Sequence, residues 1–277
     1  MTLSGRNTLF KAGIVLAALC TMLVIFGSFA AVPAYPSLAE ETTRRPEGFL
    51  AGFIGRFLNI NLYAAHASVA GSVLYALIVL ILIYYFFETT QSPEILFIAF
   101  FVVSFSLEAM RLILPLGKVY DIPSLYLLMA SRILLFSRYF GIFSLFTASV
   151  YAVGLDVQKQ RNVLLVITVA TLTIALGVPI DVQTWDSSLN MINGYISLFR
   201  LIETAVVLIT VVSFLVAAYS RGSKEYVTIS VGALLAFLGR NLLLSADTWI
   251  SPVSGILFLS FGIWFICTRL HKIYLWL

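Results

Sequence analysis

Hydrophobic residues in this chain occur in long uninterrupted runs, and short polar segments separate the runs. A run of about 20 residues crosses a bilayer as an α-helix, because each residue advances the helix by about 1.5 Å and the hydrocarbon core is about 30 Å thick. The first run covers residues 12–31. Seven further spans are predicted at about 66–87, 94–114, 124–153, 162–180, 194–219, 226–246 and 251–270. The pattern predicts an all-α polytopic membrane protein with eight transmembrane helices.

The segment 1–31 has two interpretations. Arg6 and Lys11 precede the apolar run, and Ser28-Phe29-Ala30 fits the small-residue cleavage pattern of a signal peptide. The segment is therefore either an uncleaved first span or a cleaved signal peptide followed by seven spans. The run is long for a signal peptide, which favours the uncleaved helix.

Residues 32–65 form a predicted extracytoplasmic linker, and residues 66–277 form a seven-helix membrane domain. Within the linker, apolar residues recur at helical spacing at Phe49, Leu50, Phe53, Ile54, Phe57 and Leu58. Polar residues and glycines fall between them. The linker is therefore predicted to hold one amphipathic helix lying in the membrane interface.

Loop charges predict the orientation, since lysine and arginine accumulate on the cytoplasmic side of a bacterial inner membrane. With both termini in the cytoplasm, the basic residues on that side are Arg6, Lys11, Lys159, Arg161, Arg221, Lys224, Arg269 and Lys272. The other side then holds Arg44, Arg45, Arg56 and Lys118. This imbalance predicts a multi-pass inner-membrane protein whose C-terminus is cytoplasmic.

Composition narrows the function classes. The chain is 61% hydrophobic and 11% charged, with a mean hydropathy of +1.01, and the spans leave no room for a soluble catalytic domain. The net charge of +4 is spread over loops and membrane interior, without the basic stripe that nucleic-acid binding needs. No HExxH, glycine-rich phosphate loop, nucleophile elbow or Cys/His cluster is present. We therefore predict no catalytic residue, no cofactor, no metal and no nucleic-acid partner.

Charged residues inside the predicted spans are the candidate site. A charge at mid-bilayer costs roughly 2.5–3.5 kcal/mol, so such residues pair, face the bundle interior or mark a functional pathway. Given the predicted orientation, four helices place ionisable residues at one depth near the outer leaflet, and Arg138 lies deeper. The residues of this band are Glu108, Arg111, Arg132, Arg200, Glu203 and Arg240.

The band carries more positive than negative charge. Residues three apart share a helix face, so Glu108 can pair with Arg111, and Arg200 with Glu203. Two acids cannot balance the five intramembrane arginines, which leaves an excess of three positive charges for backbone carbonyls, water, lipid phosphate or an anionic ligand. Arginine's planar fork suits carboxylate and phosphate. The band is either structural, holding helices together, or a site for an anionic or zwitterionic ligand.

The spans from about 66 to 270 resemble the membrane domains of bacterial seven-transmembrane sensors. The resemblance rests on Arg200-Leu-Ile-Glu203, on residues 217–226 leading into 232–240, and on the closing Arg269-Leu-His-Lys-Ile-Tyr274. It implies a receptor-like module that binds its ligand from the extracytoplasmic side. Because the chain stops soon after Lys272, the output is expected from a separate cytoplasmic protein. The alternatives are a carrier or substrate-binding subunit of a transporter and a non-catalytic lipid-binding scaffold.

Overall fold

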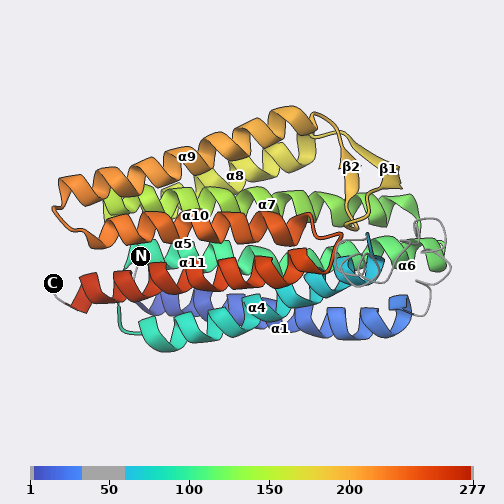
Figure 1. Cartoon of the computed structure of the whole chain (residues 1–277), viewed down its shortest axis with the longest axis horizontal. Helices are drawn as coiled ribbons and strands as arrows, with labels where there is room; N and C mark the ends of the chain where they lie inside the picture. The colour runs from blue at the N-terminus through green and yellow to red at the C-terminus, as the bar shows by residue number, and fades with distance from the viewer. Residues whose placement is uncertain (1–2, 33–59, 91, 276–277) are drawn as a thin grey trace, which may run out of the picture.

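The computed structural model describes residues 3–32, 60–90 and 92–275. Within these ranges, eight helices are long and apolar enough to cross a membrane, as expected for an all-α polytopic membrane protein. They run side by side in one elongated bundle (Figure 1). One end of the bundle, here called the termini end, holds the start of α1 (Leu3–Ala31) and the end of α11 (Ile250–Leu275). The opposite end is called the hairpin end, after the β-hairpin that lies there.

The remaining spans agree closely with the predicted ranges. They are α4 (Leu62–Phe87), α5 (Pro93–Ser106) with its continuation, α7 (Ser124–Val153), α8 (Gln160–Gly177), α9 (Ile196–Ser220) and α10 (Glu225–Leu244). A short helical turn, η3 (Val157–Lys159), leads into α8. The amphipathic helix predicted at residues 49–58 lies outside the described residues, as do Arg44, Arg45 and Arg56 of the linker.

Local sequence signals account for the helix ends. The side chain of Asn61 accepts a hydrogen bond from the backbone N–H of Tyr63, and that of Ser92 accepts from Ile95. Such caps satisfy N–H groups that have no partner within the helix. Pro93 occupies the first turn of α5, where its missing donor is harmless. Gly154 ends α7 with φ +125°, a conformation that favours glycine.

The helix that begins at Pro93 is the most buried span, and it packs against α1, α4 and α7. The sequence predicts one continuous helix over 94–114. In the structure, the 3₁₀ segment η2 (Leu107–Leu112) separates α5 from α6 (Ile113–Val119). The tighter turn changes which backbone groups pair, and the Ser137 hydroxyl donates to the Ser104 carbonyl at 2.6 Å just before the break. Both Glu108 and Arg111 lie in η2.

Helices α10 and α11 share the most extensive contact of any pair in the described bundle. Glycines seven residues apart line both sides of their contact: Gly232 and Gly239 on α10, Gly255 and Gly262 on α11. A Cβ added at Gly262 would lie 2.5 Å from the Ala236 nitrogen and 2.6 Å from the Gly232 oxygen. Small residues let two helix backbones approach closely inside a membrane. These glycines therefore set the distance between the last two helices.

The segment between α8 and α9 contains an element that the periodicity does not predict. Strands β1 (Ile180–Trp185) and β2 (Met191–Asn193) form an antiparallel hairpin, with Ile180 paired to Asn193. Only three residues of β2 take part, too few to produce an alternating pattern in the sequence. The hairpin lies at the same end of the bundle as α6 (Figure 1).

Candidate functional site

The tip of the hairpin turns into the bundle. The Asp186 carboxylate accepts hydrogen bonds from the backbone N–H groups of Ser188 (3.0 Å) and Asn190 (2.8 Å). Aspartate favours turns because it can bond to its own local backbone in this way. Leu189 adopts φ +58° and is fully buried. The tip therefore brings the Ser188 carbonyl and the Asn190 side chain among the helices.

Glu108 is the centre of a buried polar network at this end. Arg138 of α7 binds its carboxylate through two hydrogen bonds of 2.8 Å, from Nε and Nη2. The same Nη2 donates to Oδ1 of Asn190 at 2.6 Å. Arg111 approaches the other side of the carboxylate, with Nη1 3.6 Å from Oε2. Bidentate arginine–carboxylate pairing fixes orientation as well as charge, so α7, η2 and the hairpin tip are held together here.

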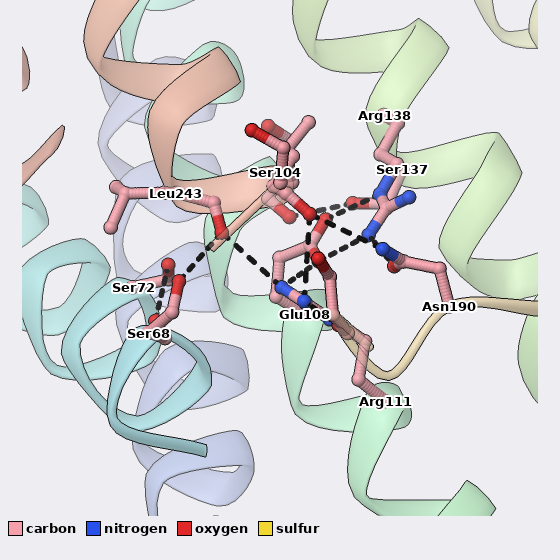
Figure 2. Close-up of polar contacts among 12 residues, drawn as sticks. Ser68, Ser72, Ser104, Glu108, Arg111, Ser137, Arg138, Asn190 and Leu243 are labelled. Carbon is pink, nitrogen blue, oxygen red and sulfur yellow. Dashed lines mark hydrogen bonds and ion pairs between the residues drawn. The ribbon is translucent and has the colours of Figure 1, made fainter. Parts of the chain in front are cut away.

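Arg111 is fully buried, and most of its partners are backbone carbonyls. It donates to the carbonyls of Ser188 on the hairpin tip and of Leu243 and Leu244 at the end of α10. The Leu243 carbonyl also accepts a 2.6 Å bond from Ser68 of α4. Figure 2 shows this chain of contacts running from Ser72 and Ser68 through Leu243 to the arginines around Glu108. The network thus joins five segments that are distant in sequence.

Arg240 of α10 links the network to α9. Its Nη2 donates to the backbone carbonyl of Arg138 at 3.3 Å and lies 3.7 Å from Oε1 of Glu203. Its side chain is 2% exposed, whereas that of Glu203 is 25% exposed. Hydrogen bonds between nitrogen and oxygen span about 2.7–3.2 Å. Glu203 is therefore paired with Arg240 electrostatically, but its carboxylate stays available for a closer partner.

A cavity of about 180 Å³ lies beside the network, between α7, α9 and the base of the hairpin. Arg138 belongs to the network and also lines the cavity. Arg200 and Glu203 are the other charged residues that line the cavity. The remaining lining residues are Leu135, Tyr139, Val178, Asn193, Gly194, Ile196 and Phe199. The cavity therefore combines apolar lining residues with polar ones, among them two arginines and one glutamate.

The structure separates the six residues of the predicted band into three groups. Glu108, Arg111 and Arg240 lie in the buried network but do not line the cavity. Arg200 and Glu203 line the cavity, yet the described residues show no ion pair between them, and the prediction that they pair is wrong. Glu203 instead faces Arg240 on the neighbouring helix. Arg132 contacts neither the network nor the cavity.

The prediction that Arg138 lies deeper than the band is wrong, since its guanidinium bonds directly to Glu108. Helix α7 has 30 residues, which span about 45 Å and exceed the hydrocarbon core. Its first turns extend beyond the hairpin-end termini of α8, α9 and α10 (Figure 1). This displacement brings Arg138 level with Glu108 and leaves Arg132 nearer the hairpin end, beside the last turn of α8.

Arg132 stabilises the C-terminus of α8. Its Nη1 donates to the carbonyls of Ala175, at 2.7 Å, and Leu176. A cation near the last carbonyls of a helix contributes about 0.3–1 kcal/mol.

We expect Arg132→Met to lower the free energy of unfolding in detergent by about 1 kcal/mol and to speed amide exchange in the last turn of α8. Arg161→Met, at the exposed first turn of α8, is the control and should change neither; equal effects in both variants would contradict the capping role.

Sequence reasoning missed several residues of the site. Asn190, Ser188, Tyr139 and Asn193 were not singled out, because each is an ordinary polar residue in its local segment. The turn residues Asp186-Ser-Ser-Leu-Asn190 do signal a tight turn, but the signal says nothing of its insertion into the bundle.

The described network and cavity hold four arginines and three carboxylates, those of Glu108, Asp186 and Glu203. The excess is one positive charge, smaller than predicted.

Glu108 is held by two arginines, and no group of three or more His, Cys, Asp or Glu residues lies together within the described ranges. No family model, curated protein sequence or solved structure matches the chain. The resemblance to seven-transmembrane sensors therefore stays a prediction.

Proposed function

We propose that this chain is a receptor-like membrane module that binds a small anionic or zwitterionic molecule in the cavity at the hairpin end and signals through a separate partner protein. The predicted orientation makes this end extracytoplasmic. The observation that supports the proposal is the position of Arg138, which lines the cavity while its guanidinium holds Glu108 and Asn190. A ligand that contacts Arg138 would act directly on the contacts that join the helices to the hairpin tip.

Arg200 gives the proposal further support. It is exposed, and within the described residues its guanidinium makes neither a hydrogen bond nor an ion pair. An arginine at membrane depth normally has a partner. An anion in the cavity would provide one, and it would also offset the excess positive charge of the site.

The first test is ligand-dependent stabilisation of the purified chain in detergent. A ligand at a hundredfold excess over its Kd stabilises by about 2.7 kcal/mol, which corresponds to a rise of roughly 5–10 °C in Tm for a chain of this size. Small phosphates and carboxylates at millimolar concentration are the probes. We expect Arg200→Gln to weaken binding at least tenfold, because a hydrogen bond to a charged group contributes about 1.5–3 kcal/mol.

Arg161→Gln is the matched control, since it removes an exposed positive charge from the first turn of α8, away from the cavity. Hydrogen exchange at the turn between α9 and α10, at the termini end, reports whether binding is transmitted. A shift in Tm without any change in exchange there would favour a lipid-binding scaffold over a receptor. A Tm that no probe raises would contradict the proposal.

A carrier or transporter subunit is the second candidate, and the 3₁₀ break at η2 favours it. Transporters often place interrupted helices beside their binding sites near the middle of the membrane. In this chain the interruption carries Glu108 and Arg111. Saturable uptake of a stabilising probe into proteoliposomes, abolished by Arg200→Gln, would select the carrier.

A further inference from the structure

We infer that the cavity recognises a zwitterion, with a phosphate or carboxylate held by Arg200 and Arg138 and an ammonium group held by Glu203. The inference rests on the proposed function and names the class of ligand. It is carried by the arrangement of opposite charges along one wall of the cavity.

The anionic half of the ligand would meet groups with free donors. Arg200 has no hydrogen-bond or ion-pair partner within the described residues. Arg138 uses Nε and Nη2 for Glu108 and Asn190, and none of its described hydrogen bonds involves Nη1. Tyr139 is 6% exposed, and its hydroxyl has no hydrogen-bond partner in the described part of the chain. All three residues line the cavity, so each can supply a donor to an anion bound there.

The cationic half would meet acceptors without close partners. The Glu203 carboxylate lies 3.7 Å from its nearest described cation, Arg240, and accepts no described hydrogen bond. Oδ1 of Asn193, another lining residue, is buried without a hydrogen-bond partner. A ligand that is only anionic would bring its charge close to Glu203, and a ligand that is only cationic would approach Arg200. A zwitterion satisfies both.

The dimensions agree with a short spacer between the two charges. Arg200 and Glu203 are three residues apart on α9, so their Cβ atoms lie about 5–6 Å apart on one helix face. Leu135, Val178 and Phe199 provide apolar contacts for one or two methylene groups. A cavity of 180 Å³ is slightly larger than the roughly 150 Å³ that holds a six-atom ring. It therefore suits a ligand of about seven non-hydrogen atoms.

Three matched probes test the charge pattern: 2-aminoethyl phosphate, ethyl phosphate, which lacks the ammonium group, and ethanolamine, which lacks the phosphate. Affinities are measured by thermal shift and by calorimetry on the full chain in detergent. We expect 2-aminoethyl phosphate to bind at least tenfold more tightly than either single-charge probe. Arg200→Gln should weaken both phosphates, whereas Glu203→Gln should remove only the preference for 2-aminoethyl phosphate over ethyl phosphate.

Glu203→Asp keeps the negative charge and serves as a second variant, for which the preference should persist in reduced form. Ethyl phosphate binding as tightly as 2-aminoethyl phosphate, with dependence on Arg200, would overturn the zwitterion and leave the proposed function standing. Binding of neither phosphate, with no stabilisation by the carboxylate probes either, would overturn both. A preference that survives Glu203→Gln would also overturn the inference, because Glu203 would then not hold the ammonium.

The zwitterion could be a free molecule or the headgroup of a phospholipid. Arg200 lies next to lipid-facing side chains, Leu198 and Leu201, which are 53% and 67% exposed. The source is tested in nanodiscs of phosphatidylethanolamine, which carries the ammonium, and of phosphatidylglycerol, which does not. A lower apparent affinity for 2-aminoethyl phosphate in phosphatidylethanolamine alone assigns the headgroup as the occupant. Equal affinity in both lipids assigns a free zwitterion.

Discussion

Glu108→Gln is expected to lower the free energy of unfolding by about 3–5 kcal/mol, the usual effect of removing one partner from a buried ion pair. For a chain of this size the loss corresponds to a fall of roughly 6–20 °C in Tm. Glu108 is 1% exposed, and both Arg138 and Arg111 direct their charges toward it. Glutamine keeps the volume but leaves two cations without a counterion and turns an amide N–H₂ toward a guanidinium donor. The measurement is thermal and chemical unfolding in detergent without ligand.

The control is Glu225→Gln, the same chemical change at the termini end. Glu225 pairs with Arg269 and Lys272, whose side chains are 40% and 53% exposed, so the loss should stay below about 1 kcal/mol. A double variant, Glu108→Gln with Arg138→Gln, should cost less than the sum of the two single changes, because the pair is removed together. Equal stability of Glu108→Gln and Glu225→Gln would show that the network does not hold the bundle together.

The spans could be predicted from the sequence because a transmembrane helix must satisfy its backbone internally and cover about 30 Å with apolar side chains. Both requirements leave a signal within one segment. The helix limits at Pro93 and Gly154 follow from the same local rules. Charge within the spans was also visible in the sequence; the structure buries the charged residues of η2 and α10 but leaves Arg200 of α9 exposed.

The candidate site could not be assembled in the same way, since its geometry depends on segments that are distant in sequence. The pairing of Arg138 with Glu108 depends on how far α7 extends beyond its neighbours, and the pairing of Glu203 with Arg240 depends on how α9 lies against α10. The i,i+3 rule favoured Arg200 as the partner of Glu203 because it considers one helix alone. The cavity depends in addition on a hairpin that leaves no periodic signal.

Gly239→Leu is expected to prevent the chain from folding, because the new side chain would run into the backbone of α11. A Cβ at this position would clash with the Leu259 nitrogen and would lie 2.6 Å from the Gly255 oxygen. Backbone atoms of a helix cannot move aside singly, so α10 and α11 would have to separate along their length. Even Gly239→Ala should cost about 3 kcal/mol, at the upper end of the usual range for overpacking.

Gly177 provides the matched control, because a Cβ there meets nothing within 4 Å. Gly177→Ala and Gly177→Leu should leave the unfolding free energy within about 0.5 kcal/mol of the parent chain. Size-exclusion profiles and unfolding in detergent distinguish the two glycines. If Gly239→Leu eluted as a monodisperse protein of parental stability, the close approach of α10 and α11 would be wrong.

Because Arg240 follows Gly239 directly and joins Glu203 to the Arg138 carbonyl, separating these helices would also disrupt the site. Gly239→Ala is therefore expected to weaken ligand binding from outside the cavity, which Gly177→Ala would not do.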